Sequence, residues 1–429
     1  MTSVPFRADV IAALARTRPV PAAAEALRSA VHTRRLLLVK TLLVRVEEGD
    51  LLPRPEARRQ FEKAWALLVA AERTDAAAVR DVLDYPMIGA WLTEMLAETD
   101  EAAAELHAAH LGGVAAVAAV RAGHLAEETL RVASGTLTLP GMGILRCPSG
   151  RVRLSGAAGQ LRIADADGHG EAVLPRPETR TDGRPYGRHD ASGWSALRVL
   201  PGSAVVLDDL DPYRAPPGGI GPAALPPAER SADSRAAWVR TWSLGRSLLV
   251  AADPDRAVEI SQVLRAVVPL APPVSDGRAP TGATRRAAPG AVLAQLPGAA
   301  WELAECLVHE THHSKLAVLQ ELVPLYRPGG RTLHTVGWRP DPRPVPAVLQ
   351  GTYAHLALID LWSRIRGRTA VPAAWRQRAA ERFDQYREDV DRALSVLLES
   401  DELTCAGREF VCEMVKHHTA LDAPTRQVM

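Results

Sequence analysis

A helical segment with two histidines four residues apart is the strongest constraint in this sequence. Apolar residues recur at three- and four-residue spacing over 301–326, which predicts one helix. The apolar positions are Leu303, Leu307, Leu316, Leu319 and Val323. Inside the segment stands His309-Glu310-Thr311-His312-His313, an H-E-x-x-H pattern. Residues i and i+4 of a helix share one face with Cβ atoms ~6 Å apart, so His309 and His313 can bind one metal ion at ~2.1 Å each.

Glu310 lies one position round the helix from His309, where its carboxylate can accept a hydrogen bond from a metal-bound water. The alternative for the five residues is a solvated polar face without a metal. The apolar surroundings favour the metal, because buried imidazole and carboxylate groups need partners. His312 points elsewhere on the helix and is expected to be a supporting or structural residue.

A two-histidine site needs a third protein ligand, and the next predicted helix offers two candidates. His355 lies in the apolar segment 351–362, which could pack against the first helix. The alternative for His355 is a core histidine that is hydrogen-bonded to a carbonyl group. Asp360 is the carboxylate candidate and would complete a two-histidine, one-carboxylate triad, the usual ligand set of non-haem Fe(II) oxygenases.

Between the two helices, residues 338–344 read Trp-Arg-Pro-Asp-Pro-Arg-Pro. The prolines restrict the backbone on both sides of the arginines, which predicts a rigid loop. We expect Arg339 and Arg343 to bind a carboxylate of a co-substrate or a peptide, because a guanidinium holds a carboxylate with two parallel hydrogen bonds. The alternative is that both arginines pair with Asp341 or with helix carbonyls and pin the loop.

Several segments together resemble the HEXXH-motif peptide-modification proteins of biosynthesis clusters for ribosomally made peptides (RiPPs). Three of them are LVHETHHSKL at 307–316, WRPDPRPVP at 338–346 and LQGTYAHLALIDLW at 349–362. LDYPMIGAWL at 83–92 and LDDLDPYR at 207–214 also fit the pattern. The resemblance spans the chain from roughly residue 80 to residue 400 and is far more specific than H-E-x-x-H alone.

The resemblance implies a tailoring enzyme that hydroxylates a side-chain β-carbon of a precursor peptide with Fe(II) and 2-oxoglutarate. It implies that His309, His313 and His355 hold Fe(II). It also implies that Arg343 binds the 2-oxoglutarate carboxylate and that Glu310 lies beside the metal ligands. The residues alone would suggest a zinc peptidase instead, with Glu310 as general base. A third interpretation is a non-catalytic peptide-binding scaffold with a structural metal, although a closed structural site has no use for the Glu310 carboxylate.

The patterning along the chain predicts an α+β fold that is mainly helical, with a small antiparallel β-rich insert between helical N- and C-terminal parts. Residues 1–133 carry helical periodicity. Residues 134–255 contain short runs separated by glycine-rich turns, which is typical of small antiparallel strands. Residues 256–429 are expected to form the helical metal-binding region that carries H-E-x-x-H.

Charge and targeting features limit the choice of partners. Lys and Arg total 51 against 50 Asp and Glu, so no overall field attracts nucleic acid or an anionic membrane. The first thirty residues lack the apolar core of a signal peptide, and no apolar run approaches the ~20 residues that cross a bilayer. The four cysteines form no zinc knuckle or iron–sulfur loop and suit a reduced cytoplasm. We therefore expect a soluble cytoplasmic enzyme with a precursor peptide as its partner, and neither nucleic acid nor a membrane.

Overall fold

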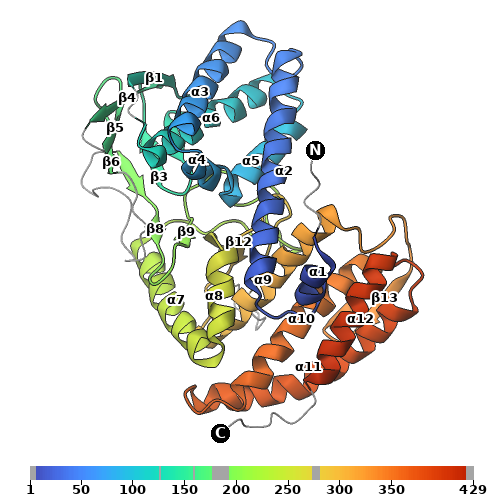
Figure 1. Ribbon diagram of the computed structural model, residues 1–429. Helices are drawn as coiled ribbons and strands as arrows, with labels where there is room; N and C mark the ends of the chain where they lie inside the picture. Colours follow the sequence, from blue (N-terminus) through green and yellow to red (C-terminus); the bar gives the residue numbers. More distant parts are fainter. Residues whose placement is uncertain (1–5, 125–126, 158–159, 176–192, 273–280, 422–429) are drawn as a thin grey trace. The chain divides into compact units, whose positions relative to one another are not determined.

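The computed structural model describes residues 6–124, 127–157, 160–175, 193–272 and 281–421 (Figure 1). The chain divides into two compact units, each assembled from segments far apart in the sequence. Unit 1 consists of Met1–Ala30, Arg240–Leu264 and Pro297–Met429, and unit 2 consists of Val31–Val239 and Arg265–Leu296. These boundaries differ from the three regions expected from the sequence, because helices α3 and α6 pack against strands β1 and β2 rather than forming a region of their own.

Helices dominate the structure, which confirms the expected α+β class with a mainly helical content. The helices are α1 Ala8–Ala15, α2 Pro21–Glu47, α3 Pro55–Thr74, α4 Ala76–Leu83, α5 Pro86–Ala97, α6 Glu101–Ala122, α7 Ala232–Ala252, α8 Pro254–Val263, α9 Ala300–Leu322, α10 Val345–Ile365, α11 Ala373–Glu399 and α12 Cys405–Ala420. The strands are β1 Glu127–Arg131, β2 Thr136–Leu139, β3 Gly143–Arg146, β4 Arg151–Ala157, β5 Gln160–Asp165, β6 Glu171–Pro175, β7 Trp194–Ala196, β8 Arg198–Val199, β9 Val206–Leu207, β10 Ala266–Pro269, β11 Gly282–Ala283, β12 Ala291–Ala294, β13 Leu333–Val336 and β14 Arg339–Pro344.

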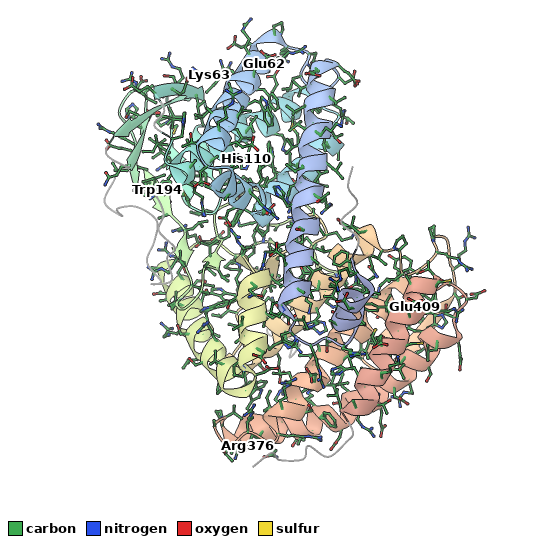
Figure 2. The ribbon with its side chains drawn as sticks, in the orientation of Figure 1. Glu62, Lys63, His110, Trp194, Arg376 and Glu409 are labelled. Atoms are coloured by element: carbon green, nitrogen blue, oxygen red, sulfur yellow. The ribbon has the colours of Figure 1, made fainter. Side chains whose placement is uncertain are left out.

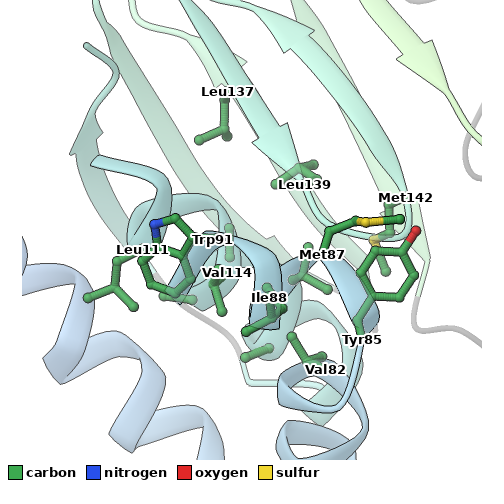
Figure 3. Close-up of a cluster of buried hydrophobic side chains, with 14 of the residues drawn as sticks. Val82, Tyr85, Met87, Ile88, Trp91, Leu111, Val114, Leu137, Leu139 and Met142 are labelled. Carbon is green, nitrogen blue, oxygen red and sulfur yellow. The ribbon is translucent and has the colours of Figure 1, made fainter. Parts of the chain in front are cut away.

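The core of unit 2 is built around helices α5 and α6. Figure 3 shows how Trp91 of α5, Val114 of α6 and Leu137 of β2 gather in this core, where all three side chains are buried. Asp100 caps the N-terminus of helix α6. Its side chain accepts a hydrogen bond from the Ala103 N–H at 2.9 Å and so satisfies one free backbone donor of the first turn. The helix is thus fixed both by its cap and by burial.

Helix α6 is long and apolar enough to cross a membrane, with a mean hydropathy of 1.3 over an 18-residue window. The expectation that no apolar run approaches this length was wrong here, because alanine, valine and glycine fill the helix after its first turns. In the structure, 67% of that window is buried inside the protein. Among the described helices, α6 alone is long and apolar enough to cross a membrane. A mostly buried helix of this kind is typical of the core of a soluble protein.

Three small sheets belong to unit 2. A four-stranded sheet in the order β1-β4-β5-β6 and a three-stranded sheet in the order β2-β3-β7 are antiparallel, as the sequence predicted. The third sheet has the order β11-β12-β10-β9-β8, and β10 pairs in parallel with both β9 and β12. The parallel pairs were not predicted, because every residue of β10 and β12 is buried and such strands lack the alternation of apolar and polar residues.

Unit 1 is a group of helices around α9 and α10. Helix α10 packs against α9 and α11, helix α12 packs against α11 and α1, and α8 contacts α9. The hairpin of β13 and β14 lies against α10 and α11. This arrangement sets the H-E-x-x-H helix next to the helix that carries His355.

Residues 339–344 form strand β14, so the rigid loop expected there was wrong. The strand pairs with β13, with His334 opposite Arg343 and Val336 opposite Arg339. In a two-stranded hairpin each strand has one unpaired edge, and an extended backbone accommodates the fixed φ of proline there. The three prolines occur at every second position, so their missing N–H groups fall on one side of the strand and leave the other side free to pair.

Candidate metal centre

Helix α9 brings His309 and His313 together as the four-residue spacing predicts. Their Nε2 atoms are 3.0 Å apart, and the ring centroids are 4.6 Å apart with the planes nearly perpendicular. Two nitrogens that each bind one metal at ~2.1 Å must lie within about 4.2 Å of each other. The pair meets this condition without any distortion of the helix.

Two hydrogen-bonded amide side chains, Gln350 and Gln320, orient the ring of His313. Its Nδ1 lies 3.1 Å from Gln350 Oε1 of α10, and because that oxygen only accepts, Nδ1 carries the proton. The Gln350 amide donates in turn to Gln320 Oε1 at 3.1 Å. Nε2 of His313 is therefore the nitrogen with the lone pair, and it faces His309. A histidine that binds a metal through one ring nitrogen usually donates the N–H of its other ring nitrogen to an oxygen atom.

His355 of α10 joins this pair, with its ring centroid 5.0 Å from that of His309. Its Nδ1 donates to Gly351 O at 2.8 Å, which again leaves Nε2 with the lone pair. Two aromatic rings stack on His355: Trp338 at 4.5 Å and Tyr386 of α11 at 5.1 Å between centroids. Gly351 makes room for this stack, since a Cβ there would lie only 2.9 Å from the Trp338 Nε1.

The three predicted histidines are thus neighbours, although their donor atoms are not arranged around one point. Within the described ranges, no group of three or more His, Cys, Asp or Glu side chains is set to hold one metal ion. Burial lowers the pKa of His309 and His313, and it lowers the pKa of His355 to about 4. All three imidazoles are therefore unprotonated at neutral pH, which is the form that binds a metal.

Asp360, the carboxylate alternative, lies apart from these histidines in a network of ion pairs. It is buried, and its Oδ2 accepts a hydrogen bond from the Arg256 guanidinium at 2.8 Å. Its Oδ1 lies 3.5 Å from Arg364 Nε and 3.8 Å from His417 Nε2. The charge of Asp360 is therefore balanced by arginines, while His355 contacts the histidine pair.

Glu310 is 5% exposed, and burial raises the pKa of its carboxyl group to about 8. No residue in the described part of the chain donates a hydrogen bond to it. Burial also raises the pKa of the Cys306 thiol, one turn earlier on α9, and the charge of Glu310 adds to this effect. A buried carboxyl group without a protein partner, with a pKa near neutrality, can take up and release a proton in the working range of an enzyme.

The two arginines of strand β14 share one carboxylate. Asp341 lies 2.9 Å from the Arg343 guanidinium and 3.4 Å from Arg339 Nε. These are the pairs expected if the arginines pin this segment. Nε of Arg343 is buried and has no hydrogen-bond partner among the described residues, so this side chain keeps an unused donor.

A different face of α9 carries a buried charge network that sequence reasoning missed. Lys315 donates to Glu259 of α8 at 2.5 Å, and Glu259 also accepts from Arg256 at 2.9 Å. Burial alone raises the pKa of Glu259, but Lys315 and Arg256 lower it to about 2. His312 belongs to this network, since Arg256 lies 3.1 Å from its Nε2 and its Nδ1 donates to Val308 O at 2.8 Å. In the sequence, only the three-residue spacing of Arg256 and Glu259 indicated an ion pair. It did not indicate burial, because a charged pair on one helix is usually exposed.

Comparisons with known proteins add no assignment. No protein-family model matches the chain, and no curated protein matches it.

Proposed function

We propose that this chain is a peptide-modifying metalloenzyme that hydroxylates a side-chain β-carbon of a ribosomally made precursor peptide with Fe(II) and 2-oxoglutarate. The observation that carries the proposal is the grouping of His309, His313 and His355. In two of them, Nδ1 donates to a protein oxygen and Nε2 keeps its lone pair. The family resemblance supplies the choice of reaction.

The residues present fit a divalent iron ion. Neutral imidazoles suit Fe(II), and three protein ligands leave positions for a chelating keto acid and O2. When bound, the iron and 2-oxoglutarate supply a two-electron oxidation in which 2-oxoglutarate loses CO2 and becomes succinate, one oxygen atom of O2 enters succinate and the other enters the peptide. His309 and His313 would hold the ion from α9, and His355 would hold it from α10. The stack of Trp338 and Tyr386 restricts rotation of the His355 ring.

Arg343 is the candidate for binding the distal carboxylate of 2-oxoglutarate. Its guanidinium is paired with the half-exposed Asp341, and exposed ion pairs contribute little stability. An incoming carboxylate can therefore replace Asp341 and also use the unpartnered Nε. Arg339, which is 46% exposed, lies farther into solvent than Arg343, which is 31% exposed, and serves as the second cation of this strand.

A zinc peptidase is the second candidate, and Glu310 is the observation that favours it. Glu310 is buried and directly follows the proposed ligand His309 on α9, so its carboxylate is suited to take a proton from a metal-bound water that attacks a peptide bond. Both candidates use the same three histidines. They differ in what they consume and in what they release.

One experiment separates the two candidates. The protein is purified without oxygen, loaded with Fe(II) or Zn(II), and incubated with the precursor peptide encoded beside its gene. We expect an intact peptide heavier by one oxygen atom, formed only with Fe(II), O2 and 2-oxoglutarate. Two shorter fragments formed with zinc and without the keto acid would overturn the hydroxylase proposal. Glu310→Gln is the matched variant, since it should nearly eliminate hydrolysis but only reduce hydroxylation.

We also propose that the enzyme works in the cytoplasm. The four cysteines form no disulfide, which suits a reducing compartment. Fractionation of cells that express the tagged protein tests this, and recovery in the membrane or exported fraction would contradict it.

A further inference from the structure

Two segments that the metal centre does not use meet inside unit 2. They are residues 83–92 and 207–214, which belong to the family resemblance but lie far from H-E-x-x-H in the sequence. The Tyr85 hydroxyl donates to Asp208 Oδ2 at 2.5 Å and joins the two segments. Figure 3 shows Tyr85 at the start of α5, within the apolar core.

A chain of aromatic contacts extends from this junction to helix α6. Trp91 of the first segment and Tyr213 of the second both contact His110, with ring centroids 5.2 Å and 4.8 Å away. Figure 2 labels His110 among the side chains of unit 2. The Tyr213 hydroxyl also lies 2.8 Å from His107 Nδ1, one turn earlier on α6. Three of these residues, His107, His110 and Tyr213, line a cavity.

The cavity has a volume of about 320 Å³ and lies between α6, the start of β2 and the 207–214 segment. Its polar lining includes Glu94, His107, His110 and Tyr213, and Ala103 and Leu137 contribute apolar surface. His110 is 9% exposed, and its Nε2 has no hydrogen-bond partner in the described part of the chain. Burial, and secondarily His107, lowers the pKa of His110 to about 3, so its ring is neutral and can accept a hydrogen bond.

The acidic side chain on the lining is Glu94, which forms an ion pair with Arg285. Of the described residues that line the cavity, Glu94 alone has a formal charge. Arg285 donates to Glu94 Oε1 at 3.1 Å and to Tyr213 O at 2.7 Å, which fixes both walls relative to each other. The arginine itself does not line the cavity. A ligand in the cavity therefore meets the Glu94 carboxylate, while the paired Arg285 lies outside the lining.

A second carboxyl group, that of Asp211, lies next to Tyr213. Asp211 is buried and accepts a hydrogen bond from the Tyr213 N–H at 2.8 Å, while its Oδ2 has no partner among the described residues. Burial raises the pKa of Asp211, and the charge of Asp208 raises it further. Burial likewise raises the pKa of Tyr213, with Asp211 and Glu94 adding to the effect. These shifts favour the protonated, neutral forms of both groups, so the negative charge that faces the cavity is that of Glu94.

We propose that this cavity binds an alkylammonium or guanidinium group. Glu94 is the counter-ion, His110 accepts a hydrogen bond, and the Tyr213 ring offers the electron-rich face on which a cation rests. Ala103 and Leu137 contact the aliphatic arm that carries the charge. The proposal needs no metal, so it stands or falls separately from the hydroxylase.

The test is calorimetric titration of the full-length protein without added metal. The probes are butylamine, its neutral match butyramide and the anion butyrate. We expect butylamine to bind at least about tenfold more tightly than butyramide, because a charge-assisted hydrogen bond is stronger than a neutral one, and we expect butyrate not to bind. Equal binding of the amine and the amide, or no binding of butylamine, would overturn the proposal.

Two sources can carry this group: a lysine or arginine side chain of a peptide, or a free amine. Titration with acetyl-Gly-Lys-Gly-amide separates them. Tighter binding of the peptide than of butylamine identifies a peptide side chain as the ligand, and tighter binding of butylamine identifies a free amine. Both results support the proposed charge, provided that acetyl-Gly-norleucine-Gly-amide binds at least about tenfold more weakly.

Variants locate the binding in this cavity. Glu94→Gln keeps an acceptor for Arg285 but removes the charge, and should weaken butylamine binding about tenfold or more. Ala103→Leu keeps every charge and fills the cavity, so it should also abolish binding. Glu105→Gln on α6, the helix of Ala103, is the matched control for the loss of a carboxylate, because Glu105 lines a different cavity. Butylamine binding that survives both Glu94→Gln and Ala103→Leu in folded protein would refute the assignment.

Discussion

Gln350 offers the sharpest test of whether His313 is a metal ligand. Its Oε1 accepts the His313 Nδ1 proton at 3.1 Å, and its own amide is fixed by Gln320 at 3.1 Å. In Gln350→Leu the Nδ1–H loses its acceptor, so the neutral ring can move its proton to Nε2 and block the lone pair that faces His309. The ring is also free to rotate away from the pair.

The magnitude follows from this one lost contact. Removal of an oxygen that orients a metal-bound histidine typically weakens metal affinity 10- to 100-fold, which is about 1.4 to 2.7 kcal/mol. We expect Gln350→Leu to fall in this range for Fe(II) and for Zn(II), measured by competition with a chromophoric chelator under anaerobic conditions. Gln350→Glu retains an acceptor oxygen and should bind metal at least as tightly as the wild type. Gln320→Leu removes the hydrogen bond that fixes the Gln350 amide but leaves Gln350 Oε1 as the acceptor for His313. The loss of metal affinity should therefore be smaller than in Gln350→Leu.

Metal affinities can be compared only between variants that are equally well folded. Gln350 is partly buried, and thermal melting checks that the leucine variant stays folded. A folded Gln350→Leu protein with wild-type metal affinity would refute the argument, because His313 would then need no support from α10.

Three further outcomes are expected. His355→Ala should lose its metal on a desalting column, whereas Asp360→Asn should keep the metal but melt at a lower temperature, because it leaves the buried Arg256 short of a partner; the reverse pattern would make Asp360 the ligand. Arg343→Lys should weaken 2-oxoglutarate binding about tenfold or more with little change in melting temperature, and a large drop in melting temperature at unchanged affinity would make this arginine a structural pin. Because the folded pKa of Glu259 is about 2 against 4.5 for the ordinary carboxyl group, its contribution of about 3 kcal/mol is present above pH 4.5 and declines as pH falls toward 2. The difference in free energy of unfolding between wild type and Glu259→Gln should therefore shrink by about 1 kcal/mol from pH 6 to pH 3.5, and an equal difference at both pH values would contradict the ion pairs.

Periodicity within single segments was enough to predict several features. The helix around the H-E-x-x-H motif, the contact of His309 with His313 and the helix that carries His355 all follow from local spacing. The prediction of a rigid loop at 338–344 was wrong, and the reason is also local. Prolines favour loops, but prolines at every second position are also compatible with the edge strand of a hairpin.

Packing between distant segments decided the rest. Asp360 and His355 lie on one helix, and the sequence predicted His355 as the third ligand with Asp360 as the carboxylate alternative. In the structure Arg256 of α8 holds the carboxylate, while Trp338 and Tyr386 stack on the imidazole. The hydrogen bond from His313 to Gln350 and the buried pair of Lys315 with Glu259 likewise join residues tens of positions apart. A sequence shows which groups must find partners once buried, because burial without a partner is costly. Which partners they find depends on the tertiary contacts between helices, and no spacing along one helix encodes these.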